Sequence, residues 1–228
     1  AGRYIYQYNG VGTTTWTQRN DLGGGSAFTG PIVDFGAVLF APAGNSVAYR
    51  YSTDGITWTT STLGAGDQNA KFFAVRSSFG TSTPVLWKTN ATGQISNHTS
   101  GQNGTGLWSA TVFLGHAGET VASFIEAENA LYAFKQEGFY SYDGTPRDDF
   151  PPRGIQRTTN GAPAFLWNNG KIYVPYGDRL MEFDPQTKDY RYIFPTDAMA
   201  GNSEINGSIT AICGDADWLY VFVKNSAG

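Results

Sequence analysis

A repeat of about 46 residues constrains the fold of this chain more than any other feature. Five apolar, aromatic-rich segments can be aligned on one equivalent residue each, namely Leu39, Leu86, Tyr132, Tyr173 and Tyr220. Neighbouring members of this set are 47, 46, 41 and 47 residues apart. Counting on from Tyr220 through the C-terminus and round to Leu39 adds another 47 residues. A period of about 40 to 50 residues built from four short strands is typical of a propeller blade. The sequence therefore predicts an all-β fold, a five-bladed β-propeller of four-stranded antiparallel blades.

The two ends of the chain each carry half of a blade. Residues 218–223, "WLYVFV", have the pattern of a second strand, whereas residues 4–10, "YIYQYNG", have the pattern of a third. We expect residues 205–228 and 1–20 to share one blade, so that backbone hydrogen bonds close the ring and no blade keeps an open edge. The other blades are expected at about 24–64, 67–116, 119–159 and 160–196, within a single domain of residues 1–228.

Composition narrows the possible partners. The chain has a net charge of −4 and its lysines and arginines are scattered singly, which argues against the basic stripe of a nucleic-acid-binding surface. No run approaches the roughly 18 apolar residues of a membrane span, so no membrane insertion is expected. The 29 glycines and 15% aromatic residues are typical of many short strands joined by tight turns.

The residues that most often bind metals or act as nucleophiles are few. The single cysteine, Cys213, lies in the apolar run "SITAICGD" and is expected to be a buried, inert thiol. The two histidines, His98 and His116, are not at ligand spacing. The sequence therefore predicts no metal site and no cofactor.

One turn carries a recognisable motif. Residues 51–60, "YSTDGITWTT", resemble the Asp-box of neuraminidase-type propeller repeats in a form one residue shorter, with matches at Ser52, Asp54, Gly55, Thr57 and Trp58. The resemblance implies a structural hairpin, in which the aspartate accepts hydrogen bonds from turn amides and the tryptophan packs between sheets. Proteins that contain the box include glycosidases, lectins and sorting receptors, so it indicates no particular activity.

A glycosidase is the first alternative to a binding role, because several five-bladed propellers hydrolyse glycans. Such chemistry needs two carboxylates at a fixed separation. The acids on predicted inner strands are Asp34, Glu126 and Glu128, and strand alternation places Glu126 and Glu128 on one face. The remaining motifs of invertase-like enzymes are absent, and Arg76 is the only arginine on a predicted inner strand where neuraminidases need three. We therefore expect no catalysis.

Aromatic side chains suggest where a ligand binds, because sugar rings stack on exposed tryptophan and tyrosine. Trp167, in "FLWNNGK" at the end of a predicted inner strand, is best placed to reach a propeller face, and Arg76 is the second candidate. The tryptophans Trp16, Trp58 and Trp108 fall on predicted outer strands, where packing between blades explains them better.

Residues 169–224 contain the run "GKIYVPYGDRLMEFDP" and, further on, "ITAICGDADWLYV". These two runs resemble successive blades in propeller segments of uncharacterised tail-associated and other structural proteins of bacteriophages. The resemblance implies a virion or extracellular surface component that belongs to a larger assembly. We therefore expect a non-catalytic propeller module that recognises a glycan or a protein surface. The alternatives are a glycan-active hydrolase and a pure scaffold or decoration domain.

Overall fold

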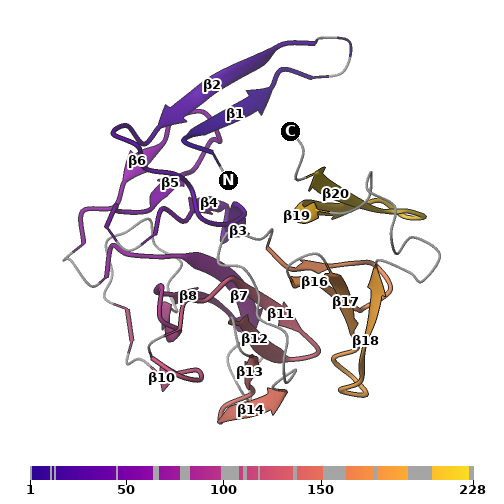
Figure 1. Ribbon diagram of the computed structural model, residues 1–228. Helices are drawn as coiled ribbons and strands as arrows, with labels where there is room; N and C mark the ends of the chain where they lie inside the picture. The colour runs from indigo at the N-terminus through magenta and orange to yellow at the C-terminus, as the bar shows by residue number, and fades with distance from the viewer. Residues whose placement is uncertain are drawn as a thin grey trace. The chain divides into compact units, whose positions relative to one another are not determined.

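The computed structural model describes residues 2–10, 12, 14–44, 46–63, 67–77, 83–98, 108–109, 112–117, 119–135, 138–150, 163–176, 179–194 and 207–225. The regular elements in these ranges are all β-strands (Figure 1). No helix in this part of the chain is long and apolar enough to cross a membrane. The chain divides into two compact units, residues 1–113 and 114–228.

The first unit holds two four-stranded antiparallel sheets and one hairpin. The first sheet contains β3 (Val33–Phe35), β4 (Val38–Ala41), β5 (Arg50–Ser52) and β6 (Thr59–Thr60). The second contains β7 (Phe72–Ser77), β8 (Pro84–Thr89), β9 (Gln94–His98) and β10 (Val112–Phe113). The hairpin consists of β1 (Tyr4–Tyr8) and β2 (Trp16–Asp21).

The second unit repeats this composition. One sheet contains β11 (Ser123–Ala127), β12 (Ala130–Phe134), β13 (Phe139–Tyr142) and β14 (Pro146–Phe150). The next contains β15 (Phe165–Leu166), β16 (Ile172–Tyr176), β17 (Arg179–Phe183) and β18 (Tyr190–Phe194). The closing hairpin consists of β19 (Gly207–Gly214) and β20 (Leu219–Asn225).

Within each four-stranded sheet the strands pair in chain order, which is the meander expected of a propeller blade. The predicted all-β class and the four-stranded antiparallel repeat are therefore confirmed. Strands β1–β2 and β19–β20 form separate two-stranded sheets in the described part of the chain. The count of five blades and the closure of the ring stay predictions.

Tight turns join the first two strands of two of the sheets. The turn between β3 and β4 consists of Gly36 and Ala37 at φ 61° and 65°, and that between β11 and β12 consists of Glu128 and Asn129 at φ 46° and 59°. Two successive residues with positive φ form the type I′ turn, whose twist matches that of the flanking strands. The same local geometry thus recurs at equivalent places in two repeats.

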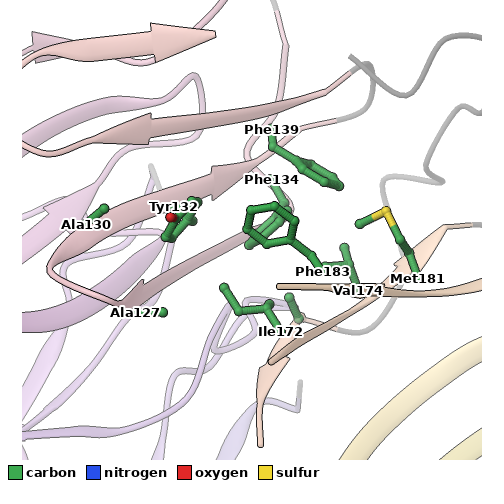
Figure 2. Close-up of a cluster of buried hydrophobic side chains, with 10 residues drawn as sticks. Ala127, Ala130, Tyr132, Phe134, Phe139, Ile172, Val174, Met181 and Phe183 are labelled. Carbon is green, nitrogen blue, oxygen red and sulfur yellow. The ribbon is translucent and has the colours of Figure 1, made fainter. Parts of the chain in front are cut away.

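The core of the second unit is a layer of aromatic and aliphatic side chains shared by two successive sheets (Figure 2). Phe134 and Phe139 meet at 4.8 Å between ring centroids, and Phe139 meets Phe183 at 5.5 Å, both edge to face. Every residue of β12 is buried, because its sheet is covered on both faces. Edge-to-face packing of this kind adds roughly 0.5–1.5 kcal/mol per pair beyond the burial of area.

In the first unit the equivalent layer includes Phe40, Tyr49, Phe73 and Trp108. Trp108 is 9% exposed, as the sequence led us to expect, and its ring stacks on Phe73 at 6.1 Å. Trp58 packs against a smaller cluster that contains Ile5. Trp16 differs from both because it is 63% exposed within its unit.

The expectation that Cys213 is buried does not hold within its own unit, where the thiol is exposed. A two-stranded sheet has one covered face in this unit, and Ile209 and Ile212 of β19 occupy it. Cys213 pairs with Tyr220 across the ladder and therefore shares the opposite, exposed face with that side chain.

Candidate functional site

A pocket of about 350 Å³ opens on the sheet formed by β15–β18. Its lining consists of Lys171, Glu182, Asp184, Thr187, Asp189, Tyr190 and Arg191. These residues come from three places: the residue before β16, the end of β17 with the turn after it, and the start of β18. The pocket is thus built at one end of a single sheet, the end at which β16 begins and β17 ends.

The turn between β17 and β18 is held by the Asp184 side chain. Asp184 Oδ1 accepts hydrogen bonds from the backbone N–H of Gln186 at 2.9 Å and of Thr187 at 3.2 Å. The backbone N–H of Lys188 donates to the Asp184 carbonyl at 2.9 Å, and Lys188 itself takes a left-handed φ of 66°. An aspartate that bonds the amides two and three residues on is a common way to fix a turn. The rim of the pocket is therefore fixed by local bonds.

Glu182 is the buried charge at the base of the pocket, with 8% of the residue exposed. Strand register places Tyr173 of β16 and Arg191 of β18 directly opposite it. Glu182 Oε1 accepts from Arg191 Nε at 2.9 Å and from Lys171 Nζ at 3.2 Å, and Oε2 accepts from the Tyr173 hydroxyl at 3.0 Å. A buried carboxylate with three donors satisfies the usual condition for keeping a charge inside a protein.

The same contacts decide the protonation state of Glu182. Burial alone would raise the pKa of its carboxyl group, but the hydrogen bonds from Arg191, Lys171 and Tyr173 outweigh burial and hold the pKa below its ordinary value. Burial, together with the hydrogen bond to Glu182, raises the pKa of the Tyr173 hydroxyl. At neutral pH Glu182 is therefore ionised, and the Tyr173 hydroxyl bonded to it is neutral.

The rim offers groups that the network does not use. Among the described residues, no hydrogen bond occupies the carboxylate of Asp189 or the terminal NH groups of Arg191, whose side chain is 70% exposed. Tyr190 is 42% exposed beside them. The pocket thus presents an acceptor, a donor and an aromatic ring on a preorganised base. In the described ranges, the pocket included, no group of three potential metal-ligating side chains comes together.

Trp167 lies beside this network but does not line the pocket. Its Nε1 donates to the carbonyl of Asp215 at 2.8 Å, and the neighbouring Asn168 donates to the carbonyl of Ala216 at 2.7 Å. The Trp167 ring meets Tyr173 edge to face at 5.9 Å. A Cβ added at Gly214 would lie 2.9 Å from this ring, which shows how closely the backbone of β19 approaches it. Trp167 therefore links the loop before β16 to the turn before β20 through a hydrogen bond.

The other residues singled out from the sequence are not among those that line the pocket. Asp34 is exposed on β3 and Arg76 is 8% exposed on β7, both in the first unit. Glu126 is half-buried on β11, whereas Glu128 occupies the tight turn after that strand and accepts from Gln186 Nε2 at 3.1 Å. Strand alternation therefore does not place Glu126 and Glu128 on one face, because the strand ends between them.

The motif around Asp54 forms a compact turn. Asp54 Oδ1 accepts from the backbone N–H of Ile56 at 2.8 Å and of Thr57 at 2.7 Å, and Ser52 Oγ accepts from the N–H of Gly55 at 2.9 Å. Gly55 has a φ of 71°, where a side chain would be strained. The backbone hydrogen bonds from Thr57 and Ile56 lower the pKa of Asp54 to about 2. The Asp54 carboxylate therefore stabilises the turn of its own hairpin.

Sequence reasoning missed Lys171, Glu182 and Arg191. The available signal was a charged residue inside or directly before each of three successive apolar and aromatic runs, in "GKIYV", "LMEF" and "YRYIF". A charged residue inside an otherwise apolar strand often marks a site with a partner. The register that brings the three together was not deducible from the pattern alone.

Comparison with known proteins supports the fold. No protein-family model matches the sequence, and no curated protein is significantly similar to it. Among solved structures, an inactive variant of virginiamycin B lyase from Staphylococcus aureus matches with a TM-score of 0.68 and 12% identity, over 96% of this chain and 70% of the lyase chain. The extracellular domain of the one-component system BT4673 from B. thetaiotaomicron matches with a TM-score of 0.60 and 13% identity.

A third similar structure, YCF48 bound to the D1 peptide, has a TM-score of 0.53 and 13% identity. This chain spans 25% of the BT4673 chain and 59% of the YCF48 chain. At these identities the similarity shows the fold alone. The chain has a β-propeller-like fold, built from repeated four-stranded antiparallel sheets.

Proposed function

We propose that this chain is a non-catalytic propeller binding module that holds a polar group of its partner in the pocket between Lys171 and Arg191. The observation that carries this proposal is the combination of a satisfied, buried Glu182 with an unused donor and acceptor at the rim. Rigid polar groups of this kind bind a ligand with little loss of side-chain entropy.

The state of the carboxylates favours binding over hydrolysis. A general acid in glycoside hydrolysis needs a carboxyl group with a raised pKa, which retains its proton at working pH. Glu182 has a lowered pKa and both of its oxygens already accept hydrogen bonds. A hydrolase that uses Asp34, Glu126 and Glu128 is the weaker alternative, because Glu128 lies in a turn rather than on the strand of Glu126.

An extracellular setting is part of the proposal. The similar domain of BT4673 is extracellular, and the resemblance of residues 169–224 to bacteriophage structural proteins favours a virion surface in particular. The similar structure of YCF48 was solved with a bound peptide, so the proposed partner is either a glycan or a protein.

We also propose that β20 pairs with β1 and so completes a fifth blade. Each terminal hairpin has one covered face and one exposed aromatic face within its own unit. In β20 the covered side chains are Leu219, Val221 and Val223 and the exposed ones are Tyr220 and Phe222, and the exposed Trp218 lies just before the strand. In β1 the covered side chain is Ile5 and the exposed ones are Tyr4, Tyr6 and Tyr8. Two half-sheets, each with an apolar face still to cover and a strand edge still to pair, suit one shared blade.

A binding screen with a pocket variant tests the proposed function. The intact chain and its Arg191→Ala variant are applied to a glycan array and a peptide array, and every hit is assayed for hydrolysis. The proposal predicts hits that the variant loses and that are not turned over. Turnover that Glu126→Gln abolishes would replace it with the hydrolase alternative, and hits that Arg191→Ala leaves unchanged would place the site elsewhere.

A further inference from the structure

The pocket limits the class of ligand that fits it, and this inference rests on the proposed function. We infer that the ligand is a neutral sugar ring with neighbouring hydroxyl groups, bound between Asp189, Tyr190 and Arg191. The charge of the lining, the polar groups left unused and the size of the pocket support this ligand class.

The charge of the lining disfavours an anionic ligand. The pocket contains two cationic side chains, Lys171 and Arg191, and three carboxylates, Glu182, Asp184 and Asp189, a formal sum of −1. Both cations bond to Glu182 Oε1, and Lys171 Nζ also lies 4.0 Å from Asp184 Oδ2. The cations are therefore largely neutralised, and an anion would meet the unpaired carboxylate of Asp189.

The unused groups equally disfavour a plain cation. A lysine or arginine side chain of a peptide could pair with Asp189, but it would also approach the guanidinium of Arg191, whose side chain is 70% exposed. The two positive charges would repel each other. A hydroxyl group both donates and accepts. Neighbouring hydroxyls of one sugar ring can donate to Asp189 and accept from Arg191, and each group is then satisfied.

Tyr190 and the pocket size complete the argument. Tyrosine presents an apolar ring face, on which the C–H face of a pyranose packs while its hydroxyls bond the flanking polar groups. A volume of about 350 Å³ lies at the lower end of the roughly 300–1,000 Å³ range of small-molecule sites. The pocket therefore suits the end of a glycan, one or two rings, rather than the middle of a long chain.

Calorimetric titration of the intact chain with three classes of probe tests the ligand class. The probes are the methyl glycosides of glucose, galactose and mannose as neutral sugars, glucuronate as the acidic sugar, and trilysine as the basic peptide. The variants are Asp189→Asn and Arg191→Lys, which keep the size and most of the shape of the side chain. Asp217→Asn is the matched control, because Asp217 is also exposed and its carboxylate makes no hydrogen bond among the described residues.

The inference predicts that at least one neutral glycoside binds, that glucuronate and trilysine bind at least about tenfold more weakly, and that each pocket variant weakens the glycoside by about tenfold or more. The control variant is expected to bind as the unsubstituted chain does. If glucuronate or trilysine binds best and the pocket variants weaken it, the ligand class is wrong while the binding function stands. If no probe binds, or if binding survives both pocket variants, the ligand class and the pocket assignment both fail.

Discussion

At the scale of single residues, Tyr173 decides how firmly Glu182 is held. Tyr173→Phe removes the donor to Glu182 Oε2 and leaves a carboxylate oxygen at an 8% exposed residue without its partner. We expect a loss of about 1 kcal/mol in the free energy of unfolding, measured by urea denaturation at pH 7. Tyr190→Phe is the control, because Tyr190 is 42% exposed. Equal stability of the two variants would show that the network does not stabilise the sheet.

Ala37 gives a second prediction at this scale. It is a non-glycine residue at a φ of 65°, in the tight turn between β3 and β4. Ala37→Gly relieves the strain of the left-handed conformation and is expected to raise the free energy of unfolding by roughly 1 kcal/mol. Ala211→Gly, on the exposed part of β19, is the comparison and should lower it. Destabilisation by both changes would contradict the strain assigned to Ala37.

At the scale of elements, the free energy of unfolding depends on pH because aspartate carboxylates stabilise several turns. Backbone hydrogen bonds lower the pKa of Asp54 to about 2, and hydrogen bonds from Arg3 and the N–H of Gly23 lower that of Asp21 to about 2. The folded pKa values lie below the unfolded value of about 4. These groups therefore stabilise the fold fully above about pH 4, and their contribution is lost as pH falls toward 2.

Thermal unfolding followed from pH 6 to pH 2 measures this effect. The melting temperature is expected to fall most steeply below about pH 4. Asp54→Asn retains an acceptor oxygen for the turn amides but does not titrate, so its melting temperature should fall less between pH 4 and pH 2. A variant with the same acid slope as the unsubstituted chain would show that Asp54 carries none of the dependence.

The elements were also what the sequence predicted best, and particular residues show why. The strands around Tyr132 and Tyr173 are continuous apolar and aromatic runs bounded by turn residues. Such runs predict strands even when the residues that pair with them are not known. Glu182 was missed because its role depends on which residues lie opposite it in β16 and β18. Glu128 was expected on a strand because a Glu-Asn turn carries no glycine to mark it. Cys213 was expected to be buried because alternation alone does not tell which face of a strand is covered.

At the scale of the whole molecule, the proposed fifth blade unites both hairpins. Deletion of residues 1–20 removes β1 and β2, so β20 loses the strand proposed to pair with it. The truncated chain is expected to unfold at a lower temperature or to associate through its unpaired edge, as calorimetry and light scattering would show. A monomeric truncated chain with unchanged melting would contradict closure.

The reactivity of Cys213 tests the closed five-bladed ring most directly. This is the only cysteine of the chain, and it lies on the face of β19–β20 that its own unit leaves exposed, opposite Tyr220. In a closed ring this face would be covered by the neighbouring blade. The rate at which a thiol reagent labels Cys213 is measured in the native chain, in the chain lacking residues 1–20 and in denaturant. The account predicts slow labelling in the native chain and fast labelling in the other two, whereas native labelling as fast as in denaturant would contradict the closed ring.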